Sequence, residues 1–218
     1  MIASGITAHE GLFVVATKWW VIPPVAYLLG SIPFGYLIVK RREGRDIRSQ
    51  GSGNIGAANV TRVAGLGAGA MTLLLDAAKG YLAVWGAARL TDENIIWIMV
   101  AALAALAGHL FPVWLGFRGG RGVATGVGVF LPVCLPAVLL ALLIWVGVAW
   151  FWRYASLASI VAAASLPLLM YLLYAPGHAP PRIVSFSVVL AAVLIILRHR
   201  ANIERLIAGT EARMKFRR

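Results

Sequence analysis

The sequence is poor in the residues with which soluble enzymes cover their surfaces and bind metals. Charged residues make up 13% of the 218-residue chain and only 8 residues are acidic, whereas soluble domains usually carry about 25% charged residues. A water-facing surface therefore cannot be covered. The single cysteine, Cys134, excludes an internal disulfide and a cysteine metal site. Because carboxylates are so few, a two-carboxylate or Mg²⁺ mechanism is disfavoured, and we expect neither a metal nor another cofactor.

Several catalytic motifs are also absent. No histidine is followed four residues later by an aspartate, so the His/Asp site of acyl-CoA-dependent acyltransferases is excluded. Neither G-x-S-x-G nor a Walker loop occurs, which excludes the serine-hydrolase elbow and the P-loop.

Long apolar runs dominate what is present. Hydrophobic residues make up 61% of the chain, in runs long enough to cross a bilayer. We predict an all-α, polytopic membrane bundle with residues 1–218 in one domain. Residues 1–18 lack the basic start and compact apolar stretch of a cleavable signal, so we expect the first span to be retained. The predicted spans are 19–39, 66–88, 95–115, 123–152, 155–175 and 182–197.

The run at 123–152 admits two topologies. If it crossed once, the basic residues before it would lie opposite those after it. If it instead enters and returns, turning near Pro132 and Pro136, 16 of the 20 lysines and arginines lie on one side. The positive-inside rule favours this second arrangement. It gives about seven membrane segments, a short or re-entrant helix near 123–131, an outside N-terminus and a cytoplasmic C-terminus.

The net charge of +12 would also fit a nucleic-acid-binding protein. The basic residues, however, fall at the ends of apolar spans, where topology and anionic lipid headgroups account for them. We therefore expect membrane lipids, and no nucleic acid, as partners.

A glycine-rich polar segment at 45–62 follows the first span. Glycine lets backbone N–H groups approach an anion closely, and the N-terminus of a following helix favours negative charge. If the residues after Asn54 are helical, Asn59 and Arg62 lie on one helix face. The segment is either a phosphate site or a loop in contact with lipid headgroups. Its candidate residues are Gly51, Ser52, Gly53, Asn54, Asn59 and Arg62.

A second polar segment, at 108–125, places two arginines around a pair of glycines. Arginine offers a planar fork that matches two phosphate oxygens. Both arginines would equally serve as helix anchors at headgroup level, and His109 is either a substrate contact or a packing residue. The candidate residues are His109, Arg118, Gly119, Gly120, Arg121 and Gly122.

A third polar region is divided between 153–159 and the tail after 198. Ser156 and Ser159 are candidate substrate contacts, although an N-cap role would also explain Ser156. His199 and Asn202 share a helix face, so both can point into one site, where histidine serves as a general base or as a hydrogen-bond donor. The alternative for the tail is an amphipathic basic helix that lies on the membrane.

One predicted span contains both Asp76 and Lys79. Either charge alone would cost several kcal/mol in hydrocarbon. We expect the two to neutralise each other inside the bundle; a proton or ion path is the alternative.

Together these segments resemble the bacterial acyl-phosphate:glycerol-3-phosphate acyltransferase family, PlsY. Arg121 stands where the family usually has lysine in Gly-Gly-Lys-Gly, which keeps the cation, and Ala58 stands where the family often has threonine. The resemblance covers nearly the whole chain from residue 20. It rests on DIRSQGSGNIGAANVTRVAG (46–65), DAAKG (76–80), GHLFPVWLGFRGGRGVATGVGVF (108–130), YASLASI (154–160) and HRANIERLIAGTE (199–211), which occur in family order.

The resemblance implies attack by the sn-1 hydroxyl of glycerol 3-phosphate on the carbonyl of acyl phosphate. The products would be lysophosphatidate and inorganic phosphate, made for phospholipid synthesis at the cytoplasmic face of the bacterial inner membrane. Either His199 or the phosphate of the substrate would take the hydroxyl proton. Catalytic roles are expected for Ser52, Arg62, Arg121, His199 and Asn202. Substrate-binding roles are expected for Gly51, Gly53, Asn54, Asn59, His109, Arg118, Gly119, Gly120, Gly122, Ser156 and Ser159.

Two functions of other classes compete with this one. A membrane transporter of an organic phosphate would use the same cationic pocket, but alternating access places its site near the midplane, whereas these polar motifs gather on one predicted face. A lipid-binding scaffold leaves unexplained why separate segments converge on a composition suited to phosphate. The acyltransferase accounts for all the segments together.

Overall fold

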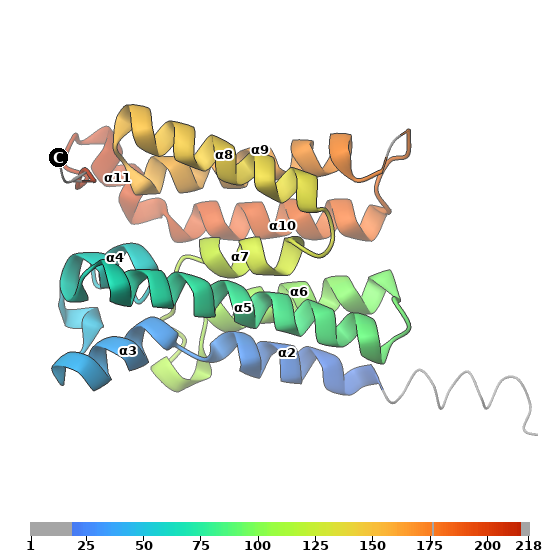
Figure 1. Cartoon of the computed structure of the whole chain (residues 1–218), viewed down its shortest axis with the longest axis horizontal. Coiled ribbons are helices and arrows are strands. Elements are labelled where there is room, and N and C mark those ends of the chain that lie inside the picture. The colour runs from blue at the N-terminus through green and yellow to red at the C-terminus, as the bar shows by residue number, and fades with distance from the viewer. Residues whose placement is uncertain (1–18, 176, 215–218) are drawn as a thin grey trace, which may run out of the picture.

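The structure of the protein is a computed structural model that describes residues 19–175 and 177–214. The prediction that the chain does not start with a cleavable signal concerns residues 1–18, which lie outside the described residues. Within the described residues the regular elements are helices, packed side by side into an elongated bundle (Figure 1). The main helices are α2 (Ile22–Ser31), α3 (Phe34–Glu43), α5 (Leu66–Leu90), α6 (Ile95–Leu110), α7 (Val123–Phe130), α8 (Leu135–Trp152), α9 (Ala155–Leu173) and α10 (Arg182–Arg198). The short ones are η1 (Trp19–Val21), η2 (Ile47–Ser49), α4 (Ala57–Ala64), η3 (Val113–Leu115) and α11 (Arg200–Ile207).

These helices confirm the predicted all-helical membrane bundle. Among the described residues, four segments are long and apolar enough to cross a membrane, and α10 with α11 makes a fifth if that pair, bent by 56°, counts as one span. Helix α5, with 25 residues, also has the length to cross, at roughly 37 Å. The four segments are Trp19–Glu43, Ile95–Leu115, Leu135–Trp152 and Ala155–Leu173.

The first predicted span is divided into α2 and α3 by a break that the sequence prediction did not include. Pro33 precedes α3 directly; its ring lacks an N–H and clashes with the carbonyl four residues earlier. The break frees the carbonyl of Ile32, which accepts a hydrogen bond from Lys79 Nζ at 2.8 Å. The kink thereby supplies a partner for a charged side chain inside the bundle.

The run at 123–152 enters and returns, as predicted. In Figure 1, α7 runs away from the end of the bundle that holds α4 and α11, and α8 runs back towards it. Helix α7 has 8 residues, about 12 Å at the usual rise, so it cannot span a bilayer. Its buried face includes Thr125 and Phe130.

Glycines let the central helices approach one another closely. A Cβ added at Gly108 would lie 2.1 Å from the Tyr27 carbonyl oxygen, and one at Gly128 would lie 2.0 Å from the Ala77 carbonyl oxygen. Such contacts are typical of membrane helices, which associate through close backbone packing. Helices α2, α5, α6 and α7 therefore form a closely packed core, and the polar segments lie towards one of its ends.

Asp76 and Lys79 form the expected ion pair in α5. Asp76 Oδ1 lies 2.8 Å from Lys79 Nζ, and both side chains are almost fully buried. His109 Nδ1 lies 3.6 Å from the same carboxylate oxygen. The two opposite charges thus neutralise each other inside the bundle, directly below the connection between α6 and α7.

Candidate active site

All the polar segments singled out in the sequence meet at one end of the bundle. Figure 1 shows α4, α11 and the C-terminal end of α3 there, while the α5–α6 and α9–α10 connections lie at the other end. The basic run Lys40-Arg41-Arg42 closes α3 at the same end. The chemistry of the site must therefore be sought at this end.

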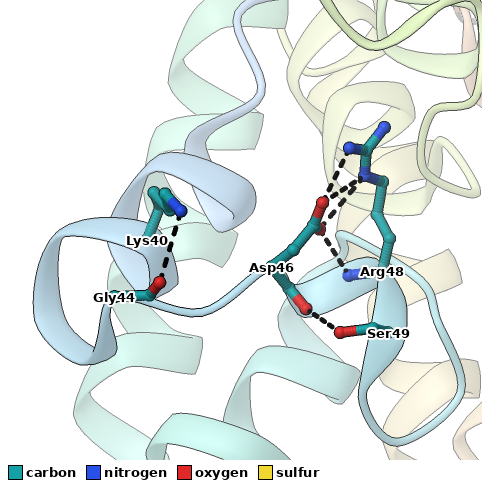
Figure 2. Close-up of polar contacts among 5 residues, drawn as sticks. All are labelled: Lys40, Gly44, Asp46, Arg48 and Ser49. Carbon is teal, nitrogen blue, oxygen red and sulfur yellow. Dashed lines mark hydrogen bonds and ion pairs between the residues drawn. The ribbon is translucent and has the colours of Figure 1, made fainter.

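The approach to the glycine-rich segment is fixed by Asp46 (Figure 2). Its carboxylate accepts the backbone N–H of Arg48 at 2.9 Å and the Arg48 guanidinium at 2.7 Å, and its carbonyl accepts the Ser49 hydroxyl at 2.8 Å. The hydrogen bond from the Arg48 side chain holds the pKa of Asp46 below its ordinary value. This capped turn aims the following residues, 50–56, which we call the first loop.

Asn59 of α4 shapes the first loop. Its side-chain oxygen accepts the Ser52 N–H at 2.9 Å and a guanidinium N–H of Arg62 at 3.3 Å. Its side-chain nitrogen donates to the carbonyls of Gln50 at 3.0 Å and Asn54 at 2.9 Å. The helical α4 therefore places Asn59 and Arg62 on one face, as predicted, with Asn59 buried behind the loop.

The glycines of the first loop meet a steric requirement. Gly51 and Gly53 have φ values of +57° and +70°, a region that other residues rarely adopt. A Cβ at Gly51 would also lie 2.2 Å from the Asn59 side-chain oxygen. Ser52, between them, is exposed, and so is Arg62; both can reach a ligand. The Asn54 side chain accepts the Gly56 N–H at 2.7 Å and so leads the chain into α4.

Residues 116–122, the second loop, lie directly over His109. The N–H of Gly119 donates to the Leu110 carbonyl at 3.2 Å, and that of Gly120 donates to the His109 carbonyl at 3.1 Å. A Cβ at Gly120 would lie 2.1 Å from His109 Nε2, so only glycine fits. The His109 ring is buried beneath the loop, which agrees with the packing interpretation of this residue.

The second loop ends at Gly122, whose φ of +86° starts α7. Arg121, just before it, is partly buried, whereas Arg118 is exposed. Burial lowers the pKa of Arg121 to about 10; the charge of Glu211 opposes this shift, and Arg205, Arg62 and Arg198 add to it. Arg121 therefore stays protonated at neutral pH. The positive charge of Arg62, in α4, lies close enough to repel that of Arg121.

Glu211 is a site residue that the sequence analysis missed. Its carboxylate accepts the Ser156 hydroxyl at 2.7 Å, the Asn202 amide at 2.6 Å and Arg205 Nε at 2.7 Å. Burial by itself raises the pKa of Glu211, but these three hydrogen bonds outweigh it and lower the pKa. The signal that could have found it is its rarity, since Glu211 is one of only 8 acidic residues in the chain and stands in a tail where basic residues predominate.

Ser156 is not an N-cap. Tyr154 holds that position in α9, without a side-chain cap. Ser156 lies two residues further along, in the first turn of α9, where its hydroxyl donates to Glu211. The N-cap explanation was therefore wrong, and Ser156 belongs to the polar cluster.

His199 lies just beyond α10 and is buried. Burial lowers its pKa to about 4, so the ring is neutral at pH 7. Its Nδ1 lies 2.8 Å from the Ile195 carbonyl; a neutral ring facing an acceptor carries its proton on Nδ1, which leaves the lone pair on Nε2. The N–H of Asn202 donates to the His199 carbonyl at 2.8 Å, so the two residues are fixed together.

Ser159 borders an apolar pocket rather than the polar cluster. Its hydroxyl donates to the Ala155 carbonyl at 2.8 Å and accepts Trp145 Nε1 at 3.0 Å. The pocket, with a volume of about 50 Å³, lies between α7, α8, α9 and α10 and includes Val123 and Ile195. It therefore starts beside the first turn of α7 and one turn before His199.

A larger cavity of about 390 Å³ is lined by Arg89, Glu93 and Tyr174. These residues belong to the opposite end of the bundle, so this cavity lies away from the polar cluster. Within residues 19–175 and 177–214, no group of three or more histidine, cysteine or acidic side chains is placed to hold a metal ion.

The same segments are shared with known proteins. The family model described as glycerol-3-phosphate acyltransferase matches residues 20–209. A Mesorhizobium japonicum protein named glycerol-3-phosphate acyltransferase is 46% identical over 188 residues, which cover 86% of this chain and 92% of that protein. A Geotalea daltonii protein of the same name is 48% identical over 186 residues, covering 85% and 92% of the two chains.

Solved structures give the same answer. The crystal structure of PlsY (YgiH), an integral membrane glycerol 3-phosphate acyltransferase, in its glycerol 3-phosphate form has a TM-score of 0.84 and 40% identity, over 91% of this chain and 96% of that one. Its lysophosphatidic acid form gives 0.81 and 38%, with the same coverage. This chain therefore belongs to the glycerol-3-phosphate acyltransferase family of integral membrane proteins.

Proposed function

We propose that the protein transfers a fatty acyl group from acyl phosphate to the sn-1 hydroxyl of glycerol 3-phosphate. The observation that carries the proposal is that Arg62 of α4 and Arg121 of the second loop, far apart in sequence, are close enough to act on each other electrostatically, and that Arg121 stands two residues before Val123 in the wall of an apolar pocket. Two cations and an apolar pocket fit two phosphorylated substrates, one of which bears an acyl chain.

The arginines address the main obstacle to this reaction, which is repulsion between two phosphate groups. Each guanidinium offers a planar fork for phosphate oxygens. Arg121 is partly buried, and in such a setting its charge is screened less than at an open surface. Arg118, exposed on the same loop, is assigned a helping role.

The reaction forms one bond and breaks one. The sn-1 oxygen attacks the carbonyl carbon, and the bond from that carbon to the phosphate oxygen breaks, giving the ester lysophosphatidate and inorganic phosphate. The hydroxyl proton ends on phosphate. Ser52 and the backbone of Gly51 and Gly53 are assigned hydrogen bonds to phosphate or to the developing oxyanion. Since acyl phosphate is already activated, positioning and charge supply most of the acceleration.

The proton has two routes from the hydroxyl. Nε2 of His199 carries a free lone pair in the neutral ring and can accept it, or the phosphate of the substrate can accept it directly. Asn202 and Ser156 are assigned to the wall of the site, where they hold Glu211 close to Arg205.

The carbonyl end of the acyl chain is assigned to the apolar pocket that Ser159 borders, and the rest of the chain is assigned to the bilayer. This pocket lies between membrane helices, so the chain would enter sideways from the bilayer. The site would face the cytoplasm at the bacterial inner membrane, because most of the basic residues lie towards its end of the bundle and basic residues favour the cytoplasmic side.

Phosphate release from the purified protein in lipid tests the proposal. We expect release when palmitoyl phosphate and glycerol 3-phosphate are supplied together, with lysophosphatidate in equal amount, and none with either substrate alone. No release from folded protein would contradict the proposal. Uptake of labelled glycerol 3-phosphate into liposomes without product would support the transport alternative instead.

A further inference from the structure

Arg198, the last residue of α10, makes its side-chain contacts with the second loop. Its Nη2 donates to the Gly119 carbonyl at 2.9 Å and its Nε donates to the Gly120 carbonyl at 3.2 Å. The guanidinium also lies 5.4 Å from the centre of the Phe111 ring. One planar guanidinium thus binds the carbonyls of two successive residues, which precede Arg198 by 79 and 78 residues in the sequence.

This contact fixes the direction of the next backbone N–H. In a trans peptide the carbonyl and the following N–H point to opposite sides. The Gly120 carbonyl faces Arg198, so the N–H of Arg121 faces away from Arg198. Within the part of the chain that the structure describes, this N–H has no hydrogen-bond acceptor. The backbone carbonyl of His109 accepts the Gly120 N–H at 3.1 Å. The glycine pair is therefore held by Arg198 through its carbonyls and by His109 through the Gly120 N–H.

We propose that Arg198 is a positioning residue that acts through the second loop to orient Arg121 and its backbone N–H towards a phosphate group. The inference rests on the proposed function, because that function assigns phosphate binding to Arg121. The planar guanidinium of Arg198 fixes the position of the loop because it donates to both carbonyls at once. A lysine would keep the charge but hold the two carbonyls less well.

A double-mutant cycle with Arg121 tests this role. We would measure kcat and KM with palmitoyl phosphate and glycerol 3-phosphate for Arg198→Met, for Arg198→Lys, for Arg121→Ala, and for Arg198→Met combined with Arg121→Ala. The control is Arg200→Met, which removes an exposed neighbouring arginine. Melting temperatures would establish that each variant is folded; if Arg198→Met does not fold, Arg198→Lys takes its place in the cycle.

We expect Arg198→Met to lower kcat/KM about 100-fold, the scale of a misplaced catalytic group. Arg198→Lys should recover only part of this loss, and Arg200→Met should stay within about 2-fold. In the Arg121→Ala background, Arg198→Met should change kcat/KM less than about 3-fold, since residues that act as a unit are not additive. Equal losses in both backgrounds, full recovery by lysine, or an unaffected folded Arg198→Met would each overturn the inference.

A binding measurement separates this inference from the proposed function. Calorimetry with inorganic phosphate does not depend on turnover. We expect Arg198→Met to weaken phosphate binding about 10-fold when Arg121 is present and to have no effect in Arg121→Ala. If the wild-type protein binds phosphate in this pattern but transfers no acyl group, the proposed function fails and the positioning role stands. If binding is the same in wild type and Arg198→Met, the positioning role fails.

Discussion

The two glycine-rich loops of the site are built in opposite ways. The first loop is organised locally, because Asn59 makes its hydrogen bonds to residues between Gln50 and Arg62. The second loop depends on distant elements: His109 holds it from below and Arg198 from the end of another helix. The conformation of the first loop is therefore determined by a short stretch of sequence, whereas that of the second loop also depends on a residue far away in the chain.

The difference separates what substitution should do in each loop. A change in the first loop disturbs its own hydrogen-bond network. A change in the second loop is transmitted to three helices, α6, α7 and α10, of which α7 and α10 also border the apolar pocket. We expect the larger losses of activity in the second loop.

The largest effect is expected at Arg121. Replacement by alanine removes a partly buried cation from the site and should lower kcat/KM about 10³-fold, the upper range for loss of one electrostatic stabiliser. Arg121→Lys should retain most activity, because it restores the positive charge. Steady-state kinetics in lipid would check both variants, and an active Arg121→Ala would remove the second loop from the chemistry.

Arg62→Ala, in α4 behind the first loop, should lower kcat/KM for glycerol 3-phosphate about 10²-fold, mainly by raising KM. Arg62 is exposed and its side chain donates a hydrogen bond to Asn59, so the fold should be unaffected. Unchanged KM and kcat would refute the assignment of Arg62 to substrate binding.

Gly120→Ala tests the contact between the second loop and His109. The added Cβ would lie 2.1 Å from the buried ring, so the loop must move, with an expected loss of about 30-fold in kcat/KM. Gly67→Ala is the matched control, since a Cβ there meets nothing within 4 Å. Similar activity in the two variants would show that the position of the loop does not matter.

Asn59→Ala should have a smaller effect on activity, about 10-fold, but a clear effect on stability. It leaves three partly buried backbone groups of the first loop without their partner, namely the Ser52 N–H and the Gln50 and Asn54 carbonyls, at about 1–3 kcal/mol. Asn94→Ala, at the opposite end, removes the N-cap of α6, at about 1 kcal/mol, and should leave activity unchanged. Thermal unfolding with parallel assays distinguishes the two, and full activity in Asn59→Ala would mean that the loop needs no such support.

The smallest effect is expected from pH. Because burial lowers the pKa of His199 to about 4, the ring loses its proton well below the 6.5 of a free histidine and is still neutral at pH 5.5. Protonation of His199 should therefore reduce kcat/KM only as the pH falls towards 4. A decline centred near 6.5 that disappears in His199→Gln would contradict this assignment of the pKa.

Most of the fold could be predicted from the sequence because its main signals are local. Apolar runs gave the membrane helices, and the placement of basic residues showed that 123–152 enters and returns. The first loop was within reach for the same reason, since Asn59 and Arg62 stand at helical spacing. The break at Pro33 was missed because the apolar run continues through it.

The remaining parts depend on packing that no local pattern reveals. Whether His109 touches substrate or packs under Gly120 is decided by the crossing of helices near Gly108. Glu211 and Arg198 gain their roles only when α9, α10 and α11 come together at the site. Ser156 was given an N-cap explanation because its position near the start of α9 fits one, although its hydroxyl turns to Glu211 instead.

A competition between acyl donors would test the central claim most directly. Purified protein in lipid would receive glycerol 3-phosphate with equal amounts of palmitoyl phosphate and palmitoyl-CoA, each with a differently labelled acyl chain, and Arg121→Ala would serve as the low-activity control. A site made of two glycine-rich loops, Arg62 of α4, Arg121 and a neighbouring apolar pocket predicts lysophosphatidate labelled from palmitoyl phosphate alone. Label from palmitoyl-CoA alone would contradict it.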